Sequence, residues 1–223
     1  MRIKIWGLLL IIILSMVSAS YGMSALDYAR KGREFQEKGQ NNEAIEYYSK
    51  AIDRGGLGDN LAIVYNNLGI AYHDKGQLDQ AISDYSTAIK LNPKYGNAYN
   101  NRGSAYYDKK QYDQAISDFN KAIELNPTDD MAYNNRGRAY YDKRQYDQAI
   151  SDFNKAIELN PKNGRAYYNK ACLYSVRNDT EEACKWFYKA ISMGYSNWER
   201  IKQDKDLDNI RNASCYKEIM AGK

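Results

Sequence analysis

The chain has 223 residues and a formal net charge of +4, and it contains one histidine, His73. Lysine and arginine are interleaved with aspartate and glutamate throughout. This excludes the concentrated basic face of a nucleic-acid-binding or anionic-membrane-binding protein. With no recognisable catalytic motif, we also expect no enzyme activity, no cofactor and no metal, because catalysis needs reactive groups that converge in one pocket.

The first residues have the pattern of an export signal. Two positive charges stand within Met1–Lys4, an apolar run follows from Ile5 to Val17, and small residues occur between positions 18 and 22. The run is shorter than the roughly 20 residues that a membrane-spanning helix needs. We predict a cleavable signal peptide over residues 1–22 and a periplasmic or secreted protein. The alternative is an uncleaved anchor or a buried helix.

From residue 25 onward the sequence has an internal repeat. Ala81, Ala115, Ala149 and Ala183 follow one another at steps of 34 residues. Within each unit, apolar and small residues recur at spacings of three and four, which predicts helices and not strands. Asn-Pro pairs at 92–93, 126–127 and 160–161 are expected to end the second helix of three units, because proline lacks an amide hydrogen.

Several places in the unit keep one kind of residue in all five copies. The eighth place is small: Gly32, Gly69, Gly103, Gly137 and Ala171. The twentieth and twenty-seventh places are alanine, and two further places are aromatic: Phe35, Tyr72, Tyr106, Tyr140 and Tyr174, then Tyr48, Tyr85, Phe119, Phe153 and Phe187. Small residues let two helices approach closely, while aromatic rings fill the space beside the crossing.

A 34-residue unit with this pattern resembles the tetratricopeptide repeat. The resemblance implies an all-α, right-handed superhelical solenoid of five helix pairs closed by C-terminal capping helices. The repeats would occupy residues 25–58, 62–95, 96–129, 130–163 and 164–197, with an insertion at 59–61 and a cap at 198–223. The cap resembles the closing segment of bacterial tetratricopeptide proteins. Its expected covering contacts are Trp198, Ile201, Leu207, Ile210, Tyr216 and Ile219.

Three cysteines, Cys172, Cys184 and Cys215, lie in the last third of the chain. Their spacing matches no zinc motif. We favour small buried side chains in helix packing, and the alternative is one disulfide with a third thiol left free. The Asp-rich string at 204–208 lacks the glycine and the terminal glutamate of a calcium-binding loop.

In tetratricopeptide domains, the second, fifth, sixth, ninth, twelfth and thirteenth places of the first helix line a concave groove. The fifth and sixth places here are rich in asparagine: Asn66, Asn67, Asn100, Asn101, Asn134, Asn135 and Asn169. A row of amides can hydrogen-bond the backbone of an extended peptide. The alternative is that these amides bond within the scaffold.

The rest of the expected groove mixes phenols, carboxylates and guanidinium groups: Ser104, Tyr107, Asp108, Arg138, Tyr141, Asp142 and Arg165, with His73 and Asp74 in the second repeat. Residues 97–127 and 131–161 differ at only three positions. Two of these, Asn97/Met131 and Ser104/Arg138, are groove places, as expected if the groove were tuned to a ligand.

The sequence therefore predicts a protein-protein interaction scaffold of the cell envelope or secreted space. It would bind a protein or peptide partner in the groove, without nucleic acid and without membrane contact beyond export. The alternative is a structural subunit of an envelope assembly that oligomerises through convex or cap surfaces.

Overall fold

The computed structural model describes residues 22–221, and within this range the chain forms helices and no β-strand. All but the last residue of the predicted signal peptide lie outside the described residues. Between residues 22 and 221, no helix has the length and apolar character needed to cross a bilayer.

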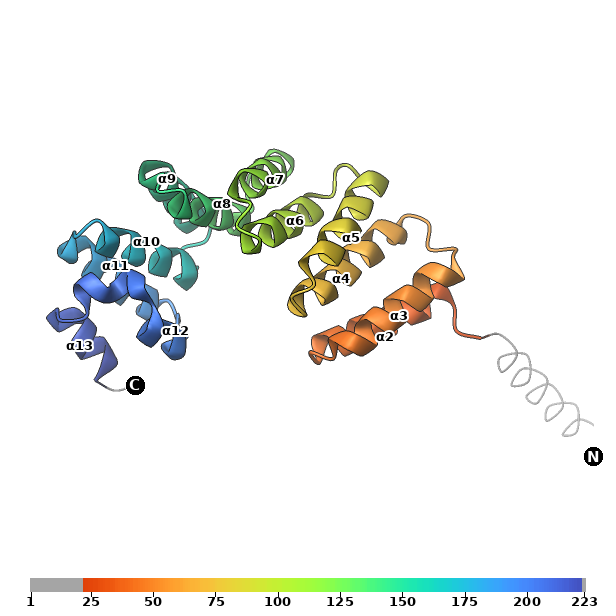
Figure 1. Cartoon of the computed structure of the whole chain (residues 1–223), viewed down its shortest axis with the longest axis horizontal. Helices are drawn as coiled ribbons and strands as arrows, with labels where there is room; N and C mark the ends of the chain where they lie inside the picture. Colours follow the sequence, from red (N-terminus) through yellow and green to blue (C-terminus); the bar gives the residue numbers. More distant parts are fainter. Residues whose placement is uncertain (1–21, 222–223) are drawn as a thin grey trace, which may run out of the picture. The chain divides into compact units, whose positions relative to one another are not determined.

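The described residues divide into two compact units, unit 1 up to residue 93 and unit 2 from residue 94 onward. Unit 1 contains two helix pairs (Figure 1): α2 (Ala25–Glu37) with α3 (Asn41–Arg54), and α4 (Asn60–Asp74) with α5 (Leu78–Leu91). Helix α4 begins at Asn60, within the stretch 59–61 that we expected as an insertion.

Unit 2 contains three helix pairs and a cap: α6 (Gly96–Asp108) with α7 (Tyr112–Leu125), α8 (Asp130–Asp142) with α9 (Tyr146–Leu159), and α10 (Gly164–Val176) with α11 (Thr180–Ser192). The cap is α12 (Trp198–Gln203), the 3-10 helix η1 (Lys205–Ile210) and α13 (Ser214–Met220), and it packs against α10 and α11 (Figure 1). The array of helix pairs confirms the predicted all-α solenoid class.

The close approach within each pair depends on the small residue at the eighth place. A Cβ atom added at Gly137 would lie 2.7 Å from Phe153 Cε1. The same addition at Gly32, Gly69 or Gly103 would also come within 2.7 Å of the aromatic ring opposite. The rings opposite these glycines are almost completely buried, so a larger side chain would have to displace close-packed core atoms.

The turn between the two helices of each pair has a left-handed residue at its fifteenth place. Gly39 and Gly76 have φ values of 71° and 72°, as expected for glycine in such turns. Lys110, Arg144 and Asn178 adopt a φ of 60° at the same place in the later repeats. The repeat geometry therefore imposes this conformation even where the residue is not glycine.

A buried ion pair joins the two helices in the third and fourth repeats. The Arg102 guanidinium donates to both carboxylate oxygens of Asp118 at 2.7 and 2.8 Å. Arg136 holds Asp152 in the same way, at 2.8 and 2.7 Å. Such a bidentate pair fixes geometry as well as compensating the buried charge.

The second repeat has the carboxylate without the arginine. Leu68 takes the place of Arg102 and Arg136, and Asp84 takes the place of Asp118 and Asp152. Burial raises the pKa of Asp84 to about 6. The charged form of Asp84 therefore destabilises unit 1 at neutral pH.

We expect Asp84→Asn to raise the free energy of unfolding by about 1 to 2 kcal/mol at pH 7.5, allowing for partial solvation of the carboxylate. Between about pH 4 and pH 6 the folded chain keeps a proton that the unfolded chain has released. Stability therefore falls as pH rises through this window and stays low above it. Urea unfolding of the wild type and the variant should show a gain in the free energy of unfolding at pH 7.5 that nearly vanishes at pH 4. Asp53→Asn, at an exposed position on α3, serves as control, and an equal gain at both pH values would contradict the assignment.

The cap covers the last repeat with the residues expected from the sequence. Ile201, Leu207 and Ile210 are fully buried, Tyr216 is 9% exposed, and Trp198 and Ile219 pack at the edge of the same cluster. In the Asp-rich string, the Asp204 carboxylate accepts a hydrogen bond from the Tyr168 hydroxyl at 2.7 Å. It also accepts one from the backbone amide of Asp206, which caps the start of η1. No group of residues suited to holding a metal ion is found between residues 22 and 221.

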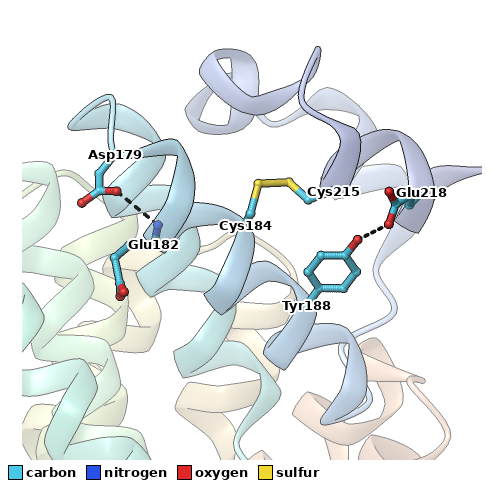
Figure 2. The surroundings of a disulfide bond; sticks show 6 residues. All are labelled: Asp179, Glu182, Cys184, Tyr188, Cys215 and Glu218. Atoms are coloured by element: carbon cyan, nitrogen blue, oxygen red, sulfur yellow. Dashed lines mark hydrogen bonds between the residues drawn. A yellow bond between two sulfur atoms is a disulfide. The ribbon is translucent and has the colours of Figure 1, made fainter.

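A disulfide joins Cys184 on α11 to Cys215 on α13, while Cys172 is free and buried. Figure 2 shows the bridge beside Tyr188, whose hydroxyl donates to Glu218 at 2.5 Å. The favoured interpretation of three unpaired cysteines was therefore wrong. The two residues are 31 positions apart, but their Cα atoms are only 5.7 Å apart because α13 folds back onto α11. The spacing of the cysteines in the sequence does not predict this fold-back.

Candidate functional site

The first helices of unit 2 bring predicted groove residues together in a small polar hollow, which we call the tyrosine hollow. It has a volume of about 100 Å³. Five predicted residues line it, together with four others: Tyr107, Arg138, Tyr141, Asp142 and Asn169, with Phe153, Cys172, Arg200 and Asp206. Residues from α6, α8 and α10 thus meet residues of the cap.

Hydrogen bonds organise the side chains of the tyrosine hollow. The Tyr107 hydroxyl donates to Asp142 and accepts from Arg138 Nη2 at 3.2 Å, and the Arg138 guanidinium lies 4.6 Å from the centre of the Tyr107 ring. The Tyr141 side chain is hydrogen-bonded to the side chain of Asp206. Burial, followed by the neighbouring carboxylates Asp204 and Asp142, raises the pKa of Asp206. The hollow is therefore a closed polar network.

A larger hollow, of about 430 Å³, lies where the start of α8, the start of α10 and the turn after α11 meet. We call it the α8–α10 hollow. Four predicted groove residues line it: Met131, Asn134, Asn135 and Arg165. The apolar part comes from Met131, which is 54% exposed, together with Met193 and Tyr195. The Tyr195 ring is held flat against Tyr168 with centroids 4.2 Å apart.

Unit 1 has a comparable hollow of about 220 Å³ between α2 and α4, the α2–α4 hollow. Its lining includes Leu26, Ile63 and Val64 with Arg30 and Arg33, and also the predicted Asn67. Leu26 and Ile63 are exposed by 50% and 39%, which is unusual for large apolar side chains. Leu26 and Ile63 occupy the second place of their repeats, as Met131 does in the fourth.

The asparagines form hydrogen bonds between successive repeats. Asn135 Nδ2 donates to Asn100 Oδ1 at 3.2 Å, and Asn169 Nδ2 donates to Asn134 Oδ1 at 2.9 Å. Asn66, Asn100, Asn134 and Asn169 are buried, with exposures of 2 to 8%. The sixth-place amide of one repeat thus bonds the fifth-place amide of the repeat before it, and part of the amide row serves the scaffold.

The other predicted residues are spread along the same helices. Ser104 donates to the Asn100 carbonyl at 3.0 Å, and Asn101 and His73 are half-buried. Asp74 and Asp108 are exposed at the ends of α4 and α6. Ligand binding by the predicted residues stays a prediction.

Sequence reasoning missed two groups of lining residues. Tyr195, Arg200 and Asp206 follow the last repeat, so the repeat count carries no signal for them. Leu26 and Arg33 had a signal, because counting groove places in the first repeat identifies both. The near-copy repeats also gave a useful signal, since Met131 and Arg138 line two hollows while their counterparts Asn97 and Ser104 line neither.

Comparison with family models decides the nature of the repeat. Models described as tetratricopeptide repeats match residues 30–85, 96–129, 131–163 and 153–185, and a model described as a TPR repeat matches residues 69–109. The helix pairs are tetratricopeptide repeats. Comparison with curated proteins finds no match.

Solved tetratricopeptide structures are similar to this chain. MamA is 28% identical, with a TM-score of 0.62 over 77% of this chain and 96% of MamA. A tetratricopeptide repeat protein from Parabacteroides merdae is 24% identical, with a TM-score of 0.69 over 90% of this chain and 77% of its own. YrrB, described as a TPR protein with an unusual peptide-binding site, is 22% identical, with a TM-score of 0.60 over 82% and 92%. At these last two identities the likeness concerns the fold alone.

Proposed function

We propose that this tetratricopeptide protein is an exported interaction scaffold whose first helices hold a segment of a partner protein or a peptide. Tetratricopeptide proteins are generally non-catalytic scaffolds, which supports a binding role over an enzymatic one. The observation that carries the proposal is the grouping of predicted groove residues around the α8–α10 hollow and the tyrosine hollow. Concave sites with a few convergent polar groups are the usual places for ligands.

The groove chemistry suits a peptide. Met131 and Tyr195 offer apolar contact, while Asn135 and Arg165 place an amide and a guanidinium beside it. Apolar anchors surrounded by polar groups are typical of protein interfaces. The Asn135 amide bonds Asn100 through one of its donor hydrogens, and an asparagine amide carries two.

Export to the periplasm, or secretion, is part of the proposal. The Cys184–Cys215 disulfide supports it, because structural disulfides persist in oxidising compartments and are rare in the cytosol. The basic, apolar and small segments at the start of the sequence support it independently. Cell fractionation should find the protein outside the cytoplasm, and alkylation under denaturing conditions without reductant should label Cys172 alone, because this thiol is buried in the folded chain.

A site-specific crosslinking experiment tests the scaffold role. A photo-crosslinking amino acid is placed at Met131, in the α8–α10 hollow, or at Tyr188, on α11 outside the hollows described. The two positions are similarly exposed, at 54% and 43%. We expect a partner from envelope extract to crosslink at position 131 and not at position 188, because only the first lies in the proposed groove.

The control position also tests the competing assembly role. Crosslinking at position 188 alone, especially to a second copy of the chain, would contradict groove binding and favour an envelope assembly. Absence of any crosslink at position 131 would remove the support for the groove.

A further inference from the structure

The α8–α10 hollow and the α2–α4 hollow share one chemistry, although they belong to different units. Each has exposed apolar side chains in its lining, Met131 in the first and Leu26 with Ile63 in the second. Each also has two cations in its lining, Lys162 with Arg165, and Arg30 with Arg33. Leu26, Ile63 and Met131 share the second place of their repeats, whereas the four cations come from different places.

The two cations of the α8–α10 hollow are not paired with carboxylates of the described residues. Arg165 and Lys162 are exposed, and neither forms an ion pair with a carboxylate among residues 22–221. Asp130 is the one carboxylate in the lining. Its Oδ2 accepts from Asn163 Nδ2 at 2.7 Å and from Asn160 Nδ2 at 3.1 Å, so it is held by amides and leaves the cations free.

The α2–α4 hollow has a cationic surplus as well. None of its lining residues is acidic. Arg30 lies 3.3 Å from Asp27, an exposed pair, while Arg33 forms no ion pair with a described residue. The two hollows therefore combine apolar surface with net positive charge.

The tyrosine hollow lacks this surplus of positive charge. In its lining, the carboxylates of Asp142 and Asp206 balance the guanidinium groups of Arg138 and Arg200. An anionic group is therefore attracted more strongly to Arg165 and Lys162 in the α8–α10 hollow than to the tyrosine hollow.

From this complementarity we infer that the partner segment carries an apolar side chain next to a carboxylate, with the apolar group in the α8–α10 hollow and the carboxylate on Arg165 and Lys162. The α2–α4 hollow offers a second position of the same kind to an acidic-apolar residue pair. The inference rests on the proposed function, since it names the chemistry of the segment that the scaffold holds.

Selection from a random library of 12-residue displayed peptides on the purified protein tests the inference and does not require an identified partner. We expect selected sequences to be enriched in aspartate or glutamate beside leucine, isoleucine, methionine or phenylalanine. Fluorescence anisotropy then measures the dissociation constants of two peptides. One is a selected acidic peptide, and the other is the same peptide with amides in place of its carboxylates. The amide version should bind about 5- to 10-fold more weakly, and the difference should shrink at high salt.

The protein variants locate the contact. Lys162→Gln with Arg165→Gln should remove the preference for the acidic peptide while leaving the affinity for the amide version nearly unchanged. Lys121→Gln with Lys155→Gln makes the same charge change at partly exposed lysines on the second helices α7 and α9, and should keep the preference. Met131→Ser should weaken both peptides.

The outcomes separate the two proposals. Selection of basic or neutral peptides would overturn the acidic partner while leaving the scaffold role in place. Acidic peptides whose preference survives Lys162→Gln with Arg165→Gln would overturn the assigned contact. Recovery of no peptide by the wild-type protein would overturn the groove proposal itself, and the acidic partner with it.

Discussion

Loss of the Cys184–Cys215 disulfide is expected to lower the free energy of unfolding of the C-terminal end by about 3 to 4 kcal/mol. The bridge closes a loop with a sequence separation of 31 residues, and in the chain-entropy model such a loop restricts the unfolded chain by about this amount. The bridge also holds α13, with Tyr216, against Phe187, the two rings being stacked at 5.8 Å. Without it, the last repeat should open before the others, because each repeat is stabilised mainly by its neighbours.

Tryptophan fluorescence during urea unfolding, with and without a reductant, measures this effect. Within residues 22–221, Trp186 and Trp198 lie in the last repeat and the cap, so their signal reports on this end. The double variant Cys184→Ala with Cys215→Ala should match the reduced wild type and should not respond to reductant. Cys172→Ala should keep the response. Three alkylatable thiols in the unfolded, unreduced protein would contradict the pairing.

Replacement of Arg136 by leucine is expected to lower the free energy of unfolding by about 2 to 4 kcal/mol at pH 7.5. The Arg136 and Asp152 side chains are 19% and 7% exposed, and removal of one partner leaves the Asp152 charge buried without compensation. The variant reproduces in the fourth repeat the arrangement that the second repeat has in Leu68 and Asp84.

A double-mutant cycle by urea unfolding checks this prediction. Arg136→Leu with Asp152→Leu should recover much of the lost stability, since an apolar pair of similar volume can replace a buried ion pair. Lys155→Leu is the control, because Lys155 and Glu158 form a surface pair that is 38% and 68% exposed and should change stability by less than about 1 kcal/mol. A double variant that recovers none of the lost stability would show that packing, and not the buried charge, decides the effect.

Local sequence was sufficient to predict the repeat. Gly137 and Phe153 meet because their helices must cross within a few residues of a short turn, so their places in the unit already imply contact. The same reasoning predicted that Tyr107, Arg138 and Met131 lie in the groove, and each of them lines one of the two hollows of unit 2. All contacts of this kind join residues within one repeat or in adjacent repeats, which is why a periodic pattern predicts them.

The cap and the completed hollows needed the tertiary structure. Cys215 reaches Cys184, and Arg200 and Asp206 reach the tyrosine hollow, because η1 and α13 fold back onto α10 and α11 after the repeat has ended. The row of asparagines is a similar case, since either a peptide or the next repeat can use an amide. The contacts of Asn135 with Asn100 and of Asn169 with Asn134 show the second use. The sequence by itself determined the repeat, its small crossing places and the pairing of its helices, because these depend on local periodicity. The tertiary structure alone decided which cysteines pair, which amides are shared and which residues line the hollows, because these depend on where non-repeating segments return.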